Sequence, residues 1–283
     1  MISARKLRLS AVSWLVLGPL IALALFPFAV MLSTALKPTP EVTAFPPRWL
    51  PSRAALENFV TMWRTVDFGT GLGNSLYVSI ASMALTLLVS VPAAYAMSRL
   101  PFRGVGIYRQ FLLVTRMLSP ILLVLGLFRM AAAIHMGDAT LIDTLISVIV
   151  IYAAFNIAFA VWMLASYFAT IPIDLEEAAW IDGANRIQSV VRIFLPLSLP
   201  AIAVTGIVTF VGSWNEFVVA LTMLRDPSRL TLPLKVVNLV AGRYTVSWNQ
   251  VMAATLLATL PVAVVFAVLQ RYLVQGLTLG AVK

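Results

Sequence analysis

Five stretches of the chain carry no charged side chain, and each is long enough to cross a membrane as a helix. A helix needs about 20 apolar residues to span the hydrocarbon core, and an ionised side chain at its centre costs at least a few kcal/mol. In chain order the stretches are Leu9 to Leu36, Phe68 to Ser98, Thr144 to Ile173, Ile193 to Asn215 and Tyr244 to Gln270. They predict five membrane-spanning helices. Continuous apolar runs of this length exclude a closed barrel, whose strands alternate.

A sixth span is predicted from 107 to 133, although Arg109, Arg116 and Arg129 leave only Met117 to Phe128 without charge. A run of about a dozen residues cannot cross a bilayer by itself. The arginines must therefore lie near the two membrane surfaces. For Arg116 we expect either a side chain that extends to the cytoplasmic face or a pair with a carboxylate.

The composition excludes a soluble fold, since 61% of the residues are hydrophobic and 11% are charged, against about 25% charged in soluble domains. The chain has no cysteine and one histidine, which excludes a disulfide framework and a Cys/His metal cluster. His135 and Asp138 are interpreted as a solvated turn. The net charge of +9 indicates anchoring at lipid head groups rather than nucleic-acid binding.

The sequence thus predicts an all-α polytopic membrane protein with one transmembrane domain over residues 1–283. The expected spans are 11–36, 71–98, 107–133, 144–168, 197–224 and 248–272, with an outer loop at 37–70 and a further loop at 169–196. Six spans put both termini on one side. Arg99, Arg103 and Arg109 crowd one short loop, which favours cytoplasmic termini. The first span is expected to stay uncleaved, because signal peptides have apolar regions of only about 7–15 residues.

The loop between the fourth and fifth spans holds the extended polar segment on the side of the termini. Asp174 followed by Glu177 predicts a capping box at the start of a short helix, and Gly183 predicts its end through a positive φ. One face of that helix would carry Leu175, Ala178, Ala179 and Asp182. Such a small-residue face suits docking to another protein. The alternative, that Glu177 only caps and the alanines only pack against the bundle, stays open.

Within this loop Glu177-Ala178-Ala179, Gly183 and the run from Ile193 to Pro196 resemble the EAA signature of permease subunits of binding-protein-dependent ABC importers. The resemblance implies a coupling helix that docks into a groove of a cytoplasmic ATPase, which places both termini in the cytoplasm. It assigns ATPase coupling to Glu177, Ala178, Ala179, Asp182, Gly183, Leu195 and Pro196.

Flanking segments resemble the carbohydrate branch of that family, typified by maltose permeases. They are Asn74 to Leu76, Pro92 to Arg99, Trp214 to Phe217 and Gly276 to Lys283. The resemblance implies a permease for a sugar, polyol or glycoside in the inner membrane. Its partners would be a second, different permease chain, two ATPase subunits and an extracytoplasmic binding protein. The chain lacks a phosphate-binding Gly-x-x-x-x-Gly-Lys-Ser/Thr loop, so we expect no enzyme activity and no cofactor here, with ATP and Mg²⁺ on the ATPase.

Polar side chains inside spans must face a cavity or a partner, which makes Asn156, Trp214, Asn215 and Glu216 candidates for the substrate path. Amide and carboxylate groups beside aromatic rings match the hydroxyl edges and apolar faces of sugars. Alternatively, Asn215 and Glu216 lock helices together or pair with a basic group at the outer rim.

Three other function classes fit a polytopic chain of this size. A secondary transporter of a small polar solute would need inverted repeats and carboxylates near the midplane. No repeat is detectable, and Glu216 is the one carboxylate inside a predicted span. A channel is the second of these alternatives. An intramembrane hydrolase lacks a Ser-His or paired-Asp arrangement.

Overall fold

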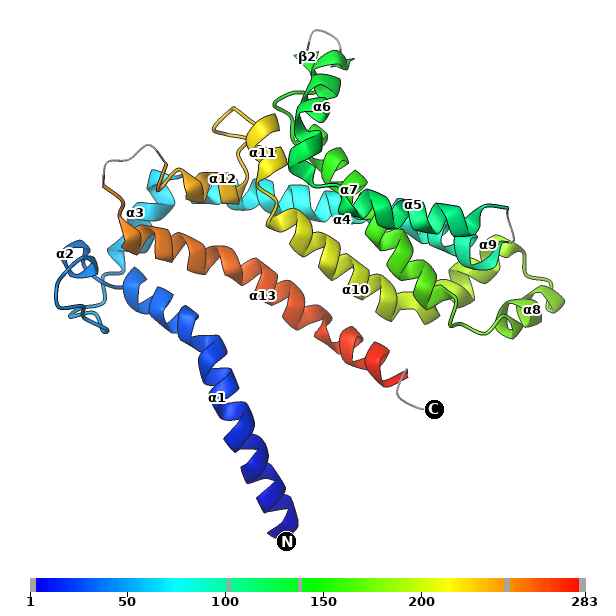
Figure 1. The fold of residues 1–283 in the computed structure, drawn as a ribbon, viewed down its shortest axis with the longest axis horizontal. Coiled ribbons are helices and arrows are strands. Elements are labelled where there is room, and N and C mark those ends of the chain that lie inside the picture. The colour runs from blue at the N-terminus through cyan, green and yellow to red at the C-terminus, as the bar shows by residue number, and fades with distance from the viewer. Residues whose placement is uncertain (1–3, 101–102, 137–138, 242–244, 280–283) are drawn as a thin grey trace. The chain divides into compact units, whose positions relative to one another are not determined.

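The computed structural model describes residues 4–100, 103–136, 139–241 and 245–279. Their regular secondary structure is helical apart from one pair of two-residue strands (Figure 1). Asp138, the side chain of His135 and the last four residues lie outside the described part. The elements are α1 (Ala4–Ala35), α2 (Thr39–Val42), α3 (Glu57–Thr65), α4 (Phe68–Arg99), α5 (Val105–Met117), α6 (Pro120–Ala133), β1 (His135–Met136), β2 (Ala139–Thr140), α7 (Leu145–Phe168), α8 (Asp174–Ile181), α9 (Arg186–Ser189), the π-helix η1 (Val190–Phe194), α10 (Leu195–Trp214), α11 (Val218–Met223), α12 (Leu232–Val237) and α13 (Trp248–Leu279).

Each of the five charge-free stretches coincides with one long apolar helix. Among the described residues, the helices long and apolar enough to cross a membrane are Ser13–Ala35, Phe68–Arg99, Leu145–Phe168, Arg186–Trp214 and Trp248–Gln270. The prediction of an all-α architecture with these spans is confirmed. The physical reason is that lipid cannot hydrogen-bond to the backbone, so an apolar segment in lipid must satisfy its own N–H and C=O groups.

The segment predicted as a single sixth span is two helices. α5 and α6 are bent by 95° at Leu118 and Ser119, so the expectation of one continuous helix over 107–133 is wrong. Pro120 explains the break, because its ring pushes the preceding residue out of the helical region. Ser119 accordingly has an extended backbone, with φ −70° and ψ 134°. The guanidinium of Arg116, in the last turn of α5, lies 5.3 Å from the ring centre of Phe159.

The fifth predicted span also ends earlier than expected. α10 stops at Trp214 rather than continuing to Leu224, and the short helix α11 follows after a break. Glu216 stabilises this break, since its carboxylate accepts the backbone N–H groups of Val219 at 3.0 Å and Ala220 at 3.3 Å. These are N–H groups of the first turn of α11, which have no partner inside the helix.

The described helices divide into two compact units. The first contains residues up to Phe68 together with Lys235–Leu260. Its buried polar centre is Asn58, which donates to the carbonyls of Ala35 and Lys37 at 2.8 and 2.9 Å and accepts from Asn249 at 3.0 Å. These bonds tie the end of α1, the start of α3 and the start of α13 together.

The proline-rich loop of this unit is held by polar contacts. Glu41 accepts the Ser52 backbone N–H at 3.1 Å and also the Ser52 hydroxyl. The Ser52 hydroxyl, followed by the backbone bond, holds the pKa of the Glu41 carboxyl below its ordinary value. The Lys37 ammonium donates to the Arg48 carbonyl. The loop between α1 and α3 is therefore structured.

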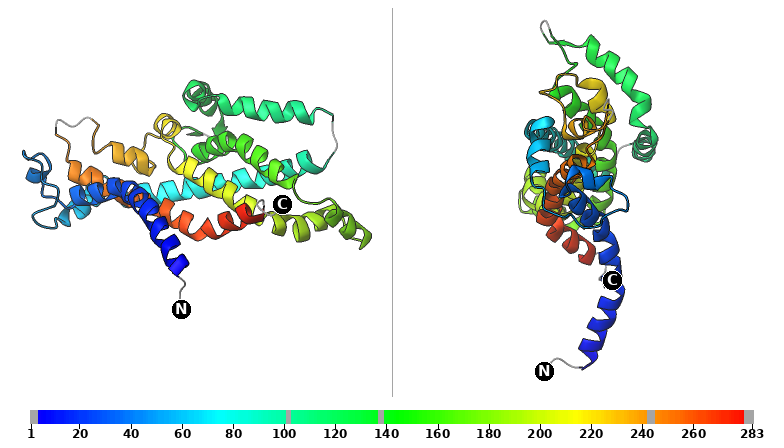
Figure 2. Two further views of the ribbon diagram at one scale, coloured as in Figure 1. Left: turned by 60° about the horizontal axis from the view of Figure 1, so that its bottom comes forward. Right: turned by 90° about the vertical axis from the view of Figure 1, so that its left-hand side faces the viewer.

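The second unit, Gly69–Leu234 with Pro261 onward, is built around α4, α7 and α10. α7 packs against both α10 and α5, as the views in Figures 1 and 2 agree. Two apolar clusters form its core. One is centred on Tyr152 and Met223 and the other on Phe168 and Phe194. The second cluster lies beside α8, which forms the tip of this unit (Figure 2).

Candidate functional site

The short helix α8 of the predicted coupling segment ends by the backbone geometry that the sequence predicts. Gly183 has φ +84°. Its N–H donates to the Trp180 carbonyl at 3.1 Å, and the N–H of Ala184 donates to the Ala179 carbonyl at 2.9 Å. These two bonds are the Schellman motif, which needs a left-handed residue after the helix. The predicted glycine stop is confirmed.

The start of α8 differs from the prediction. Ile173 is the N-cap residue and no side chain caps the helix, so a capping box between Asp174 and Glu177 is wrong. Asp174 lies one residue too far along the chain, already inside the first turn. Together with Glu176 and Glu177 it gives that turn three carboxylates. Their negative charges interact favourably with the positive end of the helix dipole.

The exposure of α8 separates an outer face from an inner one. Leu175, Glu177, Ala178 and Asp182 are exposed, as is Gly183. Ala179 and Glu176 are instead buried against the second unit. The expectation that Ala179 shares the face of Leu175 and Ala178 is therefore wrong, because a three-residue spacing from Glu176 turns Ala179 inward.

Glu176 is a residue that the sequence analysis missed, and it is the most buried carboxylate of α8 at 2% exposure. Its Oε1 lies 2.8 Å from Nε of Arg99 at the end of α4, an ion pair without the alignment of a good hydrogen bond. Its Oε2 accepts the hydroxyl of Tyr95 at 2.9 Å. Arg99 also donates to the Ile171 carbonyl and lies 5.4 Å from the ring centre of Phe194. These residues form the Arg99–Glu176 cluster.

A second helix follows α8 after the predicted break. Asn185 and Gln188 form a capping box, with the Gln188 N–H donating to Asn185 at 2.8 Å. The helix runs on through η1 into α10. Leu195 and Pro196 begin α10 directly after the π turn. The wider turn accommodates Pro196, whose ring would otherwise collide with the carbonyl four residues earlier.

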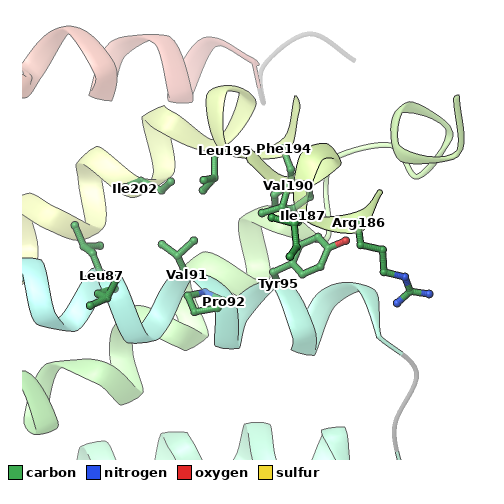
Figure 3. A pocket seen from close by; sticks show the side chains of 11 residues that line it. Leu87, Val91, Pro92, Tyr95, Arg186, Ile187, Val190, Phe194, Leu195 and Ile202 are labelled. Atoms are coloured by element: carbon green, nitrogen blue, oxygen red, sulfur yellow. The ribbon is translucent and has the colours of Figure 1, made fainter. Parts of the chain in front are cut away.

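A groove of about 600 Å³ lies between α4 and the helix 186–214. Leu87, Val91 and Pro92 line it from α4, and Val190 and Ile202 line it from the opposite side (Figure 3). Tyr95, Ile187 and Arg186 lie at one end, and Leu87 and Ile202 lie at the other (Figure 3). Its walls are apolar along most of the length. The Arg99–Glu176 cluster adjoins the end that contains Tyr95.

Asn156, a candidate for the substrate path, lies within a polar contact between helices. Its amide donates to the Tyr152 carbonyl at 2.9 Å and to the Ser213 hydroxyl at 3.2 Å. Ser82 of α4 donates to the same Ser213 oxygen at 2.9 Å. The three side chains join α4, α7 and α10 across the core. Hydrogen bonds of this kind stabilise helix packing in membranes.

The remaining path candidates occupy different environments. Trp214 is buried and stacks on Phe210 with ring centres 5.8 Å apart. Glu216 is half-buried, caps α11 and accepts the Tyr152 hydroxyl through its backbone carbonyl at 3.3 Å. Asn215 ends α10 and its side chain is exposed. The structure therefore brings Asn156 and Glu216 together around Tyr152, while Asn215 faces outward.

The family profile described as the inner membrane component of binding-protein-dependent transport systems matches residues 87–279. This range includes α8, the Arg99–Glu176 cluster and all the candidate residues. The chain belongs to this family of ABC importer permease subunits. It is accordingly a multi-pass membrane protein, as its apolar helices indicate.

Relatives of this permease match nearly its whole length. It is 32% identical over 281 residues to the sulfoquinovosyl glycerol transport system permease protein SmoH of Agrobacterium fabrum, covering 99% of this chain and 95% of SmoH. It is 33% identical to the trehalose/maltose transport system permease protein MalG of Thermococcus litoralis, covering 92% of this chain and 91% of MalG. Its fold is similar to that of a bacterial ABC transporter involved in alginate import, with TM-score 0.78, 22% identity and coverage of 96% and 99%.

Proposed function

We propose that this permease imports a sugar or a related polyol or glycoside across the cytoplasmic membrane, as one of two permease chains in an ATP-driven transporter. The second chain is a different permease. Support for the substrate class comes from the names of the relatives, which transport sulfoquinovosyl glycerol, trehalose and maltose. A soluble binding protein delivers the substrate from outside.

The observation that carries this proposal is the outer face of α8. Glu177, Ala178 and Asp182 are exposed on a helix whose end is set by Gly183 and whose inner face is paired with α4. A helix that is rigidly held on one side and bare on the other suits docking to a second protein. We propose that this face, together with Leu195 and Pro196 at the start of α10, couples the permease to a cytoplasmic ATPase that holds the ATP and Mg²⁺, with both termini of this chain in the cytoplasm.

For the substrate path we propose the break between α10 and α11. Irregular backbone at membrane depth is tolerated where it is buried in protein or lines a water-filled cavity. The exposed amide of Asn215 is the group at this break that offers both donor and acceptor capacity to a hydroxyl. Asn156, Trp214 and Glu216 lie next to it and hold the helix ends in place.

The test uses the absence of cysteine in the chain. A single cysteine at Ala178 is expected to cross-link to a cysteine-bearing ATPase subunit in purified transporter, whereas one at the exposed Ser166 of α7 is not. Uptake of labelled sugars into proteoliposomes should require internal ATP and external binding protein. Uptake driven by an ion gradient without ATP, or equal cross-linking from both positions, would contradict the proposal.

A further inference from the structure

We infer that Arg99 and Glu176 are positioning residues that make α8 move as one body with the cytoplasmic end of α4. The inference rests on the proposed function, because it assigns to this ion pair the transfer of ATPase movement into the membrane helices. Neither side chain would touch substrate or nucleotide.

The cluster connects four parts of the second unit. Arg99 and Tyr95 belong to α4, Glu176 to α8, and Phe194 to the π turn that leads into α10. The Ile171 carbonyl, which accepts from Arg99, belongs to the turn that links α7 and α8. A force on α8 therefore acts on α4 and on the start of α10 through direct contacts as well as through the covalent link.

Burial makes the connection hard to break. The side chain of Arg99 is 9% exposed and that of Glu176 is 2% exposed. Separating the two would leave a desolvated charge without a partner, which is far costlier than losing a surface ion pair. The Tyr95 hydroxyl adds a hydrogen bond to the same carboxylate. The pair is thus expected to persist while neighbouring helices rearrange.

The groove shows where rearrangement can take place. α4 and the helix 186–214 are separated by about 600 Å³ of space lined by apolar side chains. The cluster joins them next to the end of this groove where Tyr95 and Phe194 lie (Figure 3). Closing or opening the groove breaks no polar contact among its lining residues in α4 and α10. The π turn at Val190–Phe194 lies beside the joined end, and π turns are frequent at functional sites in helices. The geometry suits a hinge motion of α4 relative to α10, with the hinge at Phe194.

The experiment compares variants in the complete transporter reconstituted in proteoliposomes. Arg99→Gln and Glu176→Gln each remove one charge, and Arg99→Lys keeps it. The double variant Arg99→Met/Glu176→Leu removes both charges while filling the space, and such exchanges of a buried ion pair are often neutral for stability. Arg103→Gln, which removes an exposed arginine close to the end of α4, is the control.

We expect the double variant to assemble and to keep basal ATPase activity. Stimulation of the ATPase by ligand-loaded binding protein, and uptake, should fall by about tenfold, within the range of about 5- to 150-fold that couplings between sites span. Arg99→Lys should retain most of the ATPase stimulation and most of the uptake of the parent chain. Arg103→Gln should change neither. Spin labels on cysteines at Leu100 and Asp174 should give one narrow distance in the parent chain and a broad distribution in the double variant.

The inference is overturned if the double variant assembles with full stimulation or keeps the narrow distance distribution. The outcome is separable from a failure of the proposed function. If a chain with the single change Ala178→Cys does not cross-link to the ATPase, ATPase docking itself is contradicted. If that cross-link forms normally and the double variant keeps full stimulation, only the role of the ion pair is contradicted.

Discussion

Gly183 offers a direct test of whether backbone conformation at the end of α8 controls coupling. A Cβ atom at this position would meet nothing within 4 Å, so a substitution there creates no collision with neighbouring groups. The cost is the positive φ, about 1–2 kcal/mol for an L-residue and more for a β-branched one. If the substituted residue at position 183 instead adopts a negative φ, the helix loses the two Schellman hydrogen bonds, which contribute about 1 kcal/mol each. Either route weakens the end of α8 by about 1–3 kcal/mol.

We expect the effect to rise from Gly183→Asn to Gly183→Ala to Gly183→Val, since asparagine tolerates the left-handed region best. Limited trypsin cleavage after the exposed Arg186 measures the opening of this segment, and each 1.4 kcal/mol should speed it about tenfold. ATPase stimulation should fall in the same order while the protein still inserts.

Gly73→Ala is the matched control, because this α4 glycine also has open space around its Cβ position but no positive φ. It should leave cleavage after Arg186 unchanged. Wild-type uptake and cleavage in Gly183→Val would refute the reasoning, and so would a ranking in which asparagine is worse than valine.

Two further predictions concern the helix core and the orientation. Ser213→Ala removes the hydroxyl that joins Asn156 to α4 and should lower thermal stability in detergent by about 0.6–2 kcal/mol, with normal uptake per assembled complex; an unchanged midpoint would contradict the packing role. A cysteine at Ser52 should react with an impermeant reagent from outside, and one at Gln188 should not. Gln188 suits this purpose because it is exposed, whereas the neighbouring Ser189 is buried. The reverse pattern of labelling would invert the topology.

The local features of this permease follow from the sequence because each depends on neighbours along the chain. Charge-free length predicts the five long helices, since the bilayer imposes the same requirement on any apolar segment. The φ of Gly183 is predictable because few other residues adopt it without strain. The bend before Pro120 follows from the same kind of rule, and the error over 107–133 came from giving hydropathy more weight than the residue before proline.

The tertiary structure alone decided which side of α8 faces inward. Glu176 and Glu177 are adjacent carboxylates, and the periodicity of the sequence does not indicate which of them is buried. Arg99 lies in another helix, and its pairing with Glu176 depends on how α4 and α8 pack together. Likewise the hydrogen bond from Asn156 to Ser213 joins two helices, so it depends on how α7 and α10 pack together. Side-chain partners that are distant in the chain meet only through packing, so local sequence rules predicted the helices of this permease and left their polar contacts to the fold.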